Sequence, residues 1–160
     1  MDKENQDNIL KVIHATAPIR INDIGGWTDT WFAGEGKVLN LAVSPAVEVQ
    51  VKVFKAKSRA KKRVVVHAEN FAETFSMDPD RPAKDRHPLL QFTIGSRPIP
   101  KDYRLEISLY SPVPAGISTG TSAAVCVALL GALDALTPKK LAWAEIARLA
   151  HEVETEKLGQ

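Results

Sequence analysis

Hydrophobic and polar residues alternate along two stretches of this chain. Valines alternate with glutamate, glutamine and lysine within residues 38–54, and leucine and isoleucine alternate with polar residues across 104–110. A period of two predicts β-strands that bury one face. Residues 9–21 and 63–67 are also predicted to be extended, and we expect 63–67 to form a hairpin with 38–54.

Longer apolar segments in the second half of the chain have the spacing of helices. Residues 122–136 are strongly apolar, and residues 138–157 place their apolar positions on one face of an amphipathic helix. A shorter helix is predicted over 88–94, with a proline at its first position. Residues 71–88 combine prolines with charges, so we expect a loop with at most one helical turn. This mixture of elements predicts an α+β two-layer sandwich rather than a doubly wound sheet.

Composition and charge are those of an ordinary globular domain. The chain has 160 residues, of which 44% are hydrophobic and 25% charged, and its formal net charge is +2. That charge is too small to argue for a nucleic-acid or membrane partner. No signal peptide or membrane-spanning stretch is visible, and the single cysteine, Cys126, lies in an apolar run. We therefore expect a soluble cytoplasmic protein with no membrane partner.

Residues 111–124 are dense in glycine and hydroxyl residues and join a predicted strand to the apolar helix. The first backbone N–H groups of a helix are unpaired and carry partial positive charge, so a small-residue loop there can bind a phosphate. The alternative is that Thr121 or Ser122 only caps the helix. The residues alone leave both interpretations open. The segment lacks the Gly-Lys-Ser/Thr of a Walker A loop.

Residues 17–30 place a cation, two carboxylates and an indole around a Gly-Gly turn. Arg20 suits the charge of a transferring phosphoryl group, Asp23 and Asp29 can accept hydrogen bonds from sugar hydroxyls, and Trp27 can cover a sugar face. The alternative is a surface loop in which Arg20 pairs with one of the two aspartates.

Residues 114–124 resemble the phosphate loop of the GHMP kinases, the superfamily of galactokinase, homoserine kinase, mevalonate kinase and phosphomevalonate kinase. The usual pattern there is Pro-x-Gly-x-Gly-Leu-Gly-Ser-Ser-Ala-Ala, and this chain departs from it at Ser118 and Thr119. The resemblance implies ATP and Mg²⁺ as cofactors, with Ser122 holding both Mg²⁺ and the β/γ-phosphates. The implied ATP-binding residues are Pro114, Gly116, Ser118, Gly120, Thr121 and Ser122.

Residues 17–30 resemble the first motif of the sugar-kinase branch of this superfamily. Galactokinases have Gly-Arg-x-Asn-x-Ile-Gly-Glu-His-Thr-Asp, and the Ala-Pro-x-Arg-x-x-x-x-Gly-Gly-Trp-Thr-Asp form of heptose and fucose kinases is nearer still. The resemblance implies that Arg20 is catalytic, near the transferred phosphate, and that Gly26, Trp27 and Asp29 bind the sugar. It also implies the ribosomal protein S5 domain 2-like sandwich of GHMP kinase N-terminal domains.

The resemblance further implies a glutamate on the last helix that completes the Mg²⁺ site. Glu152, Glu154 and Glu156 are candidates, and Glu154 is favoured by its position along the chain. A catalytic aspartate is expected in a Gly-x-Gln-Asp-Gln-like segment just after Gln160. We therefore expect residues 1–160 to be the ATP-binding N-terminal domain, truncated before that segment and before a C-terminal domain, with exposed apolar surface that promotes self-association.

The function predicted from these motifs is ATP-dependent phosphoryl transfer to a hydroxyl of a small-molecule sugar, with the activity of the chain alone left open. One alternative is a non-catalytic nucleotide- or sugar-binding relative. A weaker alternative is an RNA-binding α+β domain, based on the basic residues between 52 and 63, for which a solvated hairpin tip is the favoured interpretation.

Overall fold

Residues 9–25, 35–56, 61–114 and 119–158 are described by the computed structural model. They form a five-stranded sheet with the strand order β1-β2-β5-β3-β4. The strands are β1 (Ile9–Ile24), β2 (Leu39–Lys55), β3 (Val64–Ala68), β4 (Glu73–Met77) and β5 (Tyr103–Tyr110). The helices are α1 (Pro88–Gly95), α2 (Thr121–Asp134) and α3 (Trp143–Glu152), with a 3-10 turn at Glu69–Phe71 and a π-helical turn at Val153–Lys157.

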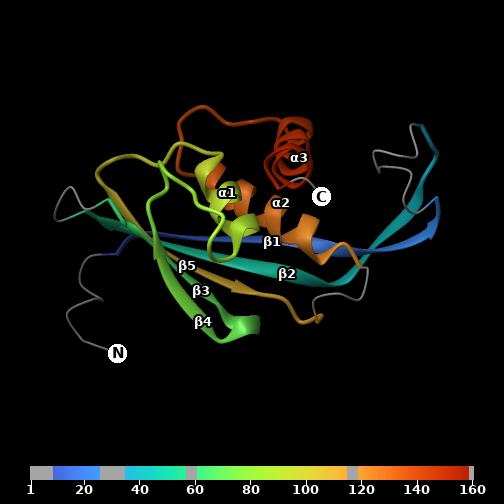
Figure 1. Cartoon of the computed structure of the whole chain (residues 1–160), viewed down its shortest axis with the longest axis horizontal. Helices are drawn as coiled ribbons and strands as arrows, with labels where there is room; N and C mark the ends of the chain where they lie inside the picture. The colour runs from blue at the N-terminus through green and yellow to red at the C-terminus, as the bar shows by residue number, and fades with distance from the viewer. Residues whose placement is uncertain (1–8, 26–34, 57–60, 115–118, 159–160) are drawn as a thin grey trace.

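The helices lie on one face of the sheet, which gives the mixed α+β architecture expected from the sequence (Figure 1). α2 packs across β1 and β2, and α1 and α3 pack against α2. Neighbouring strands are antiparallel except for β3 and β5, which are parallel. β1 and β4 are the two edge strands of the sheet.

The predicted hairpin between residues 38–54 and 63–67 is wrong, because β5 lies between β2 and β3. Arg63 explains this arrangement. Its side chain is only 6% exposed and donates to the carbonyls of Ile99 at 2.9 Å, Pro100 at 2.9 Å and Tyr103 at 3.3 Å. The backbone N–H of Leu105 also donates to the Arg63 carbonyl at 2.9 Å. These bonds hold the start of β5 beside the start of β3.

The sequence also predicted some element boundaries incorrectly. β4 lies in the segment expected to be a loop, because Phe75 and Met77 bury one face of a short alternating stretch that precedes the prolines. The predicted helix 138–157 starts later, at Trp143, where the Glu145 carboxylate accepts from the Ala142 N–H at 2.8 Å. β1 continues to Ile24, into the predicted turn.

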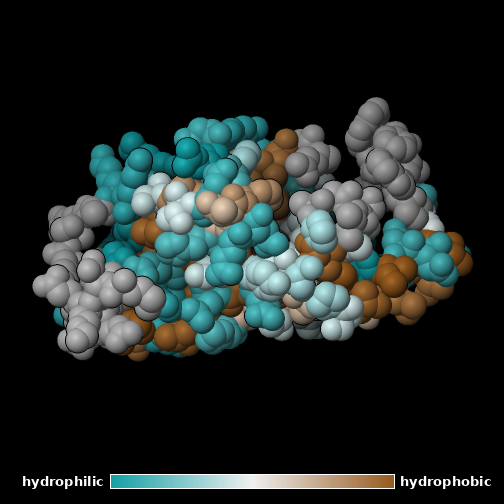
Figure 2. Space-filling view, turned by 90° about the horizontal axis from the view of Figure 1, so that it is seen from below, coloured by the Kyte–Doolittle hydropathy of each residue, from teal (hydrophilic) through white to brown (hydrophobic). Residues whose placement is uncertain are grey.

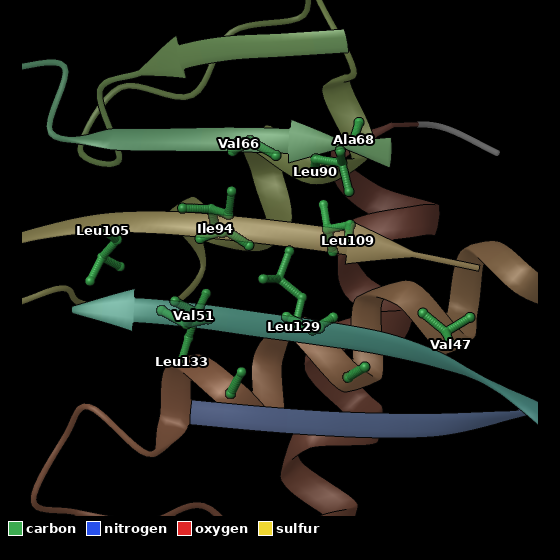
Figure 3. Close-up of a cluster of buried hydrophobic side chains, with 14 of the residues drawn as sticks. Val47, Val51, Val66, Ala68, Leu90, Ile94, Leu105, Leu109, Leu129 and Leu133 are labelled. Carbon is green, nitrogen blue, oxygen red and sulfur yellow. The ribbon is translucent and has the colours of Figure 1, made fainter. Parts of the chain in front are cut away.

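The core fills the space between the sheet and the first two helices (Figure 3). Leu129 and Leu133 of α2 are fully buried and face the valines of β2, while Ile94 of α1 packs against β5. A second cluster joins α2 to α3 through Cys126, Leu130 and Ala150. α2 thus buries side chains towards the sheet and towards its neighbouring helices, and this is why its sequence is apolar on nearly every face.

One partly buried ion pair ties the ends of α1 and α2 to the link before α3. Arg97 Nη2 donates to Asp134 Oδ1 at 2.6 Å and to Thr137 Oγ1 at 2.7 Å, and the two charged side chains are 11% and 8% exposed. Asp134 also accepts from the Leu141 N–H at 3.3 Å. Because each charge is hydrogen-bonded, removing one partner would leave the other buried and uncompensated.

The paired ends of β1 and β2 project beyond the other three strands as a two-stranded ribbon (Figure 1). Large apolar side chains are exposed on it, and Figure 2 shows the apolar surface at this end of the molecule. We call these residues the apolar ribbon; they are Ile21, Ile24, Val38, Leu39 and Leu41.

In the described part of the chain, no helix is both long enough and apolar enough to cross a membrane.

The ribbon depends on a glycine that a larger residue cannot replace. Gly25 has a φ of +82°, and a Cβ built on it would lie 2.0 Å from the Lys37 carbonyl oxygen. We expect Gly25→Ala to lower the free energy of unfolding by more than about 2 kcal/mol, from backbone strain and from this clash. Urea denaturation of both proteins measures the difference.

Gly131→Ala is the matched control, because a Cβ at Gly131, inside α2, meets nothing within 4 Å. There the same substitution should stabilise the protein by about 0.5–1 kcal/mol through helix propensity. Similar changes in the two variants would contradict the strain at Gly25.

Candidate functional site

The two sequence motifs meet at the free edge of β1. The backbone N–H of Arg20 donates to the Thr119 carbonyl at 2.9 Å, so the loop before α2 is hydrogen-bonded to the edge strand. The sequence separates these residues widely, and the sheet topology brings them together. Within the described residues Arg20 forms no ion pair with Asp23, while Asp29, the other aspartate considered as its partner, lies outside them.

Gly120 lets the Arg20 side chain lie against the start of α2. A Cβ built on Gly120 would be 3.0 Å from Arg20 Nε and 3.2 Å from Arg20 Cγ. The φ of Gly120 is +68°, a left-handed conformation that favours glycine. Both the backbone angle and the close approach therefore require glycine at this point, and the guanidinium stem is held beside the helix N-terminus.

Gly120 is also the N-cap of α2, and it supplies no side-chain cap hydrogen bond. Thr121 and Ser122 are the first residues inside the helix, so the prediction that one of them caps it is wrong. The Ala124 N–H donates to the Gly120 carbonyl at 3.0 Å and starts the helical ladder. The physical reason is the left-handed glycine, which turns the chain into the helix without a side-chain cap and leaves the hydroxyls of Thr121 and Ser122 for other partners.

The hydroxyl groups around this turn are close together. Thr119 Oγ1 and Thr121 Oγ1 are 3.0 Å apart and hydrogen-bonded, while Ser122 is exposed. The helix N-terminus attracts an anion through its dipole and its unpaired N–H groups. The hydroxyl donors and the positive charge of the nearby guanidinium add to this attraction. Phosphate is the ligand that this chemistry suits best.

Comparison with known proteins agrees with this chemistry. Residues 89–160 match the family model described as GHMP kinases N terminal domain. A mevalonate kinase of Pyrococcus horikoshii is 44% identical over 50 residues, which cover 31% of this chain and 15% of that protein. Residues 89–160 thus resemble the N-terminal domain of the GHMP kinases. Kinases of this family are ATP-dependent enzymes that phosphorylate small molecules.

Solved structures of sugar kinases share the fold. A D-glycero-D-manno-heptose 1-phosphate kinase from Bacteriodes thetaiotaomicron is 24% identical with a TM-score of 0.73, over 93% of this chain and 49% of that one. A galactokinase of Lactococcus lactis, solved with galactose, is 21% identical with a TM-score of 0.74, over 95% of this chain and 39% of that one. The chain thus spans about half the length of the heptose kinase, and less of the galactokinase.

Several residues predicted for the GHMP kinase site lie outside the described part of the structure. They are Gly26, Trp27 and Asp29 of the sugar motif, and Gly116 and Ser118 of the phosphate loop. Pro114 is described and exposed, just before the loop. The residues that the structure brings together are therefore Arg20, Thr119, Gly120 and Thr121, with Ser122 following on the first turn of α2.

The sequence analysis did not include Thr119 among the residues predicted to bind phosphate. Its carbonyl accepts from Arg20 and its hydroxyl bonds to Thr121, so it joins both motifs. The available signal was its departure from the usual leucine, which replaces an apolar side chain with a hydroxyl. Arg63 was also misjudged, since it was included in a solvated basic turn and is in fact buried.

Glu154, the residue predicted to complete the metal site, is half-buried in the π-helical turn after α3. Its negative charge helps to raise the pKa of the Cys126 thiol, and Cys126 lies one turn further along α2 than Ser122. Glu152 instead pairs with Arg148 on the same helix. Ser122 and Glu154 offer oxygen ligands of the kind that Mg²⁺ prefers, and Mg²⁺ commonly takes only one or two protein ligands beside substrate phosphates. Among the described residues, no group of three or more His, Cys, Asp or Glu side chains is placed to hold a metal ion.

The Cys126 thiol is held in its neutral form. Burial between α1, α2 and α3 raises its pKa from 9.0 to about 12. The negative charge of Glu154 adds to the rise, and a hydrogen bond between the thiol and the Thr93 hydroxyl opposes it. The thiolate is the reactive form, so this cysteine is a packing residue in the folded protein.

We expect iodoacetamide at about pH 8 to modify Cys126 much more slowly in the folded chain than in urea, since almost no thiolate forms at that pH in the fold. Mass spectrometry follows the reaction. Because the folded pKa lies above the unfolded one, the stability from keeping the thiol protonated is complete below about pH 9 and is lost as the pH rises towards 12. Equal rates of modification with and without urea would contradict the burial.

Proposed function

We propose that this chain binds Mg-ATP at the N-terminus of α2 and forms the nucleotide-binding half of a kinase that phosphorylates a sugar hydroxyl. One observation supports the proposal above the others. Arg20 of the N-terminal motif lies against Gly120 and is hydrogen-bonded to Thr119. The cation of one motif therefore lies beside the loop of the other motif, which resembles a phosphate-binding loop. Phosphoryl transfer requires this combination of donors and positive charge.

In the proposed complex the chain's own groups bind and orient the phosphates. The first N–H groups of α2 and the hydroxyls of Thr121 and Ser122 would donate to phosphate oxygens. The Arg20 guanidinium would stabilise charge on the phosphoryl group that is transferred. Ser122 and Glu154 would hold Mg²⁺, which supplies positive charge to the β- and γ-phosphates when bound.

The acceptor in the proposal is a sugar of the heptose or fucose type, bound by Gly26, Trp27 and Asp29. Support comes from the sequence pattern of residues 17–29 and from the way β1 continues from Arg20 to Ile24, towards those residues. A carboxylate for hydroxyl groups and an indole for a sugar face are suited to such a ligand. A non-catalytic relative that binds the same nucleotide is the competing function, favoured by Ser118 and Thr119 in place of the usual residues.

The apolar ribbon supports the further proposal that residues 1–160 work next to another domain. Its side chains are between 44% and 60% exposed, which is much apolar surface for one end of a small domain. We propose that the other half of a GHMP kinase covers such surface, or that copies of the chain associate through it, and that the chain alone transfers phosphate slowly or not at all. A reducing cytoplasmic setting belongs to the proposal, in keeping with a lone buried cysteine.

Isothermal titration with Mg-ATP tests nucleotide binding by the chain itself. We expect the wild-type chain to bind and Ser122→Ala to raise the dissociation constant by about tenfold or more, because a hydroxyl that contacts a charged group is lost. Ser76→Ala is the control, since Ser76 is an exposed serine on β4 at the opposite edge of the sheet.

A wild-type chain without measurable affinity for Mg-ATP would overturn the proposed function. Equal affinities of the wild type and Ser122→Ala would overturn the role given to Ser122. Adding the sugar substrates of heptose and fucose kinases to the nucleotide complex then tests the acceptor, since a sugar that binds its site should change the apparent affinity for the nucleotide.

A further inference from the structure

Thr119 departs from the leucine of the usual phosphate loop, and the structure gives its two polar groups separate partners. Its carbonyl oxygen accepts from the Arg20 N–H at 2.9 Å, and its Oγ1 lies 3.0 Å from Thr121 Oγ1. A leucine at this position would keep the backbone contact and lose the hydroxyl contact. The hydroxyl therefore adds a contact with Thr121, the first residue of α2, to the backbone contact with the strand that carries Arg20.

The arrangement of protons in this pair determines what Thr121 can do. Each hydroxyl has one proton to donate and two lone pairs that accept. If Thr119 donates to Thr121, the Thr121 proton remains available for another acceptor. If Thr121 donates to Thr119, its proton is used within the pair. An anion at the N-terminus of α2 selects the first arrangement, because only then does Thr121 donate to it.

The surroundings favour an anion here rather than water alone. The Arg20 side chain passes beside Gly120, and Gly120 contributes no side-chain cap that would compete for the same N–H groups. Hydrogen bonds in a chain also polarise each other, so donation from Thr119 makes the Thr121 hydroxyl a better donor.

We propose that Thr119 is a positioning residue that orients and polarises the Thr121 hydroxyl towards a nucleotide phosphate. The inference rests on the proposed function, since it assigns a role within the same nucleotide site. It makes a specific claim about mechanism: the Thr119 hydroxyl acts on affinity only through Thr121. A purely structural hydroxyl would instead stabilise the loop, so its removal would lower the thermal stability of the protein together with its affinity for the nucleotide.

A double-mutant cycle with Mg-ATP affinity as its readout tests this claim. We expect Thr121→Val to raise the dissociation constant about tenfold or more, because a charge-assisted hydrogen bond to phosphate is lost. Thr119→Val should raise it about threefold to tenfold, because a neutral hydrogen bond is lost. In the Thr121→Val background, Thr119→Val should change the affinity by less than about twofold. Thr119→Ser, which keeps the hydroxyl, should restore affinity to within about twofold of the wild type.

Thr74→Val provides the matched control, because Thr74 Oγ1 also forms a side-chain hydrogen bond, to His67 Nδ1 at 3.0 Å, on the far edge of the sheet. It should leave the affinity unchanged. Thermal unfolding of every variant identifies any that fail to fold, and Thr119→Ser keeps the test valid if the valine variant is unstable.

The possible results distinguish failure of the proposed function from failure of the role given to Thr119. A wild-type chain that does not bind Mg-ATP overturns the proposed function and this inference with it. A wild-type chain that binds, with Thr119→Val equal to it, overturns the inference alone. Additive effects of Thr119→Val and Thr121→Val also overturn it, because Thr119 would then act independently. Failure of Thr119→Ser to restore affinity would assign the effect to the methyl group instead of the hydroxyl.

Discussion

The hydrogen bond from the Arg20 N–H to the Thr119 carbonyl is the contact that the arrangement of the site depends on. β1 is an edge strand, and an edge strand presents unpaired backbone groups that need a partner. The loop before α2 supplies one such partner. This backbone bond needs no particular side chain, so it fixes where the two motifs meet and leaves their side chains free for a ligand. Gly120 then allows the approach to be close, because any Cβ there would crowd the Arg20 side chain.

The position of that loop in turn requires that α2 be rigidly placed. Leu129 and Leu133 anchor the helix to the sheet, and Cys126 and Leu130 anchor it to α1 and α3. A helix buried on so many sides cannot slide without opening cavities, each of which costs free energy in proportion to its volume. The first turn of α2, with Thr121 and Ser122, is the part that emerges from this packing. A fixed helix with an accessible N-terminus is well suited to orient a charged ligand.

Local patterns in the sequence predicted the strands and helices that follow one simple period. The alternation in β2 and β5 and the apolar run of α2 each have a single physical solution, burial of one face or of a whole helix. Pairing between strands was harder to predict, since the position of β5 between β2 and β3 depends on the buried Arg63 and its contacts with the carbonyls of the 99–103 turn. A charged residue among lysines resembles a solvated turn until its acceptors are known. β4 was missed because a strand of five residues, followed by Pro79 and Pro82, shows little periodicity.

For the segment predicted to bind phosphate, the motif and the geometry again contribute different information. The pattern of residues 114–124 indicated which residues matter, and it could not distinguish a capping hydroxyl from a ligand-binding one. The deciding feature is the backbone of Gly120, whose left-handed conformation makes it the N-cap and places Thr121 and Ser122 inside the helix. Hydroxyl groups that do not cap are available to donate elsewhere. The same geometry explains what Thr119 adds in place of the usual leucine. Its hydroxyl forms a hydrogen bond with the Thr121 hydroxyl inside the loop, and an apolar side chain would leave Thr121 without this partner.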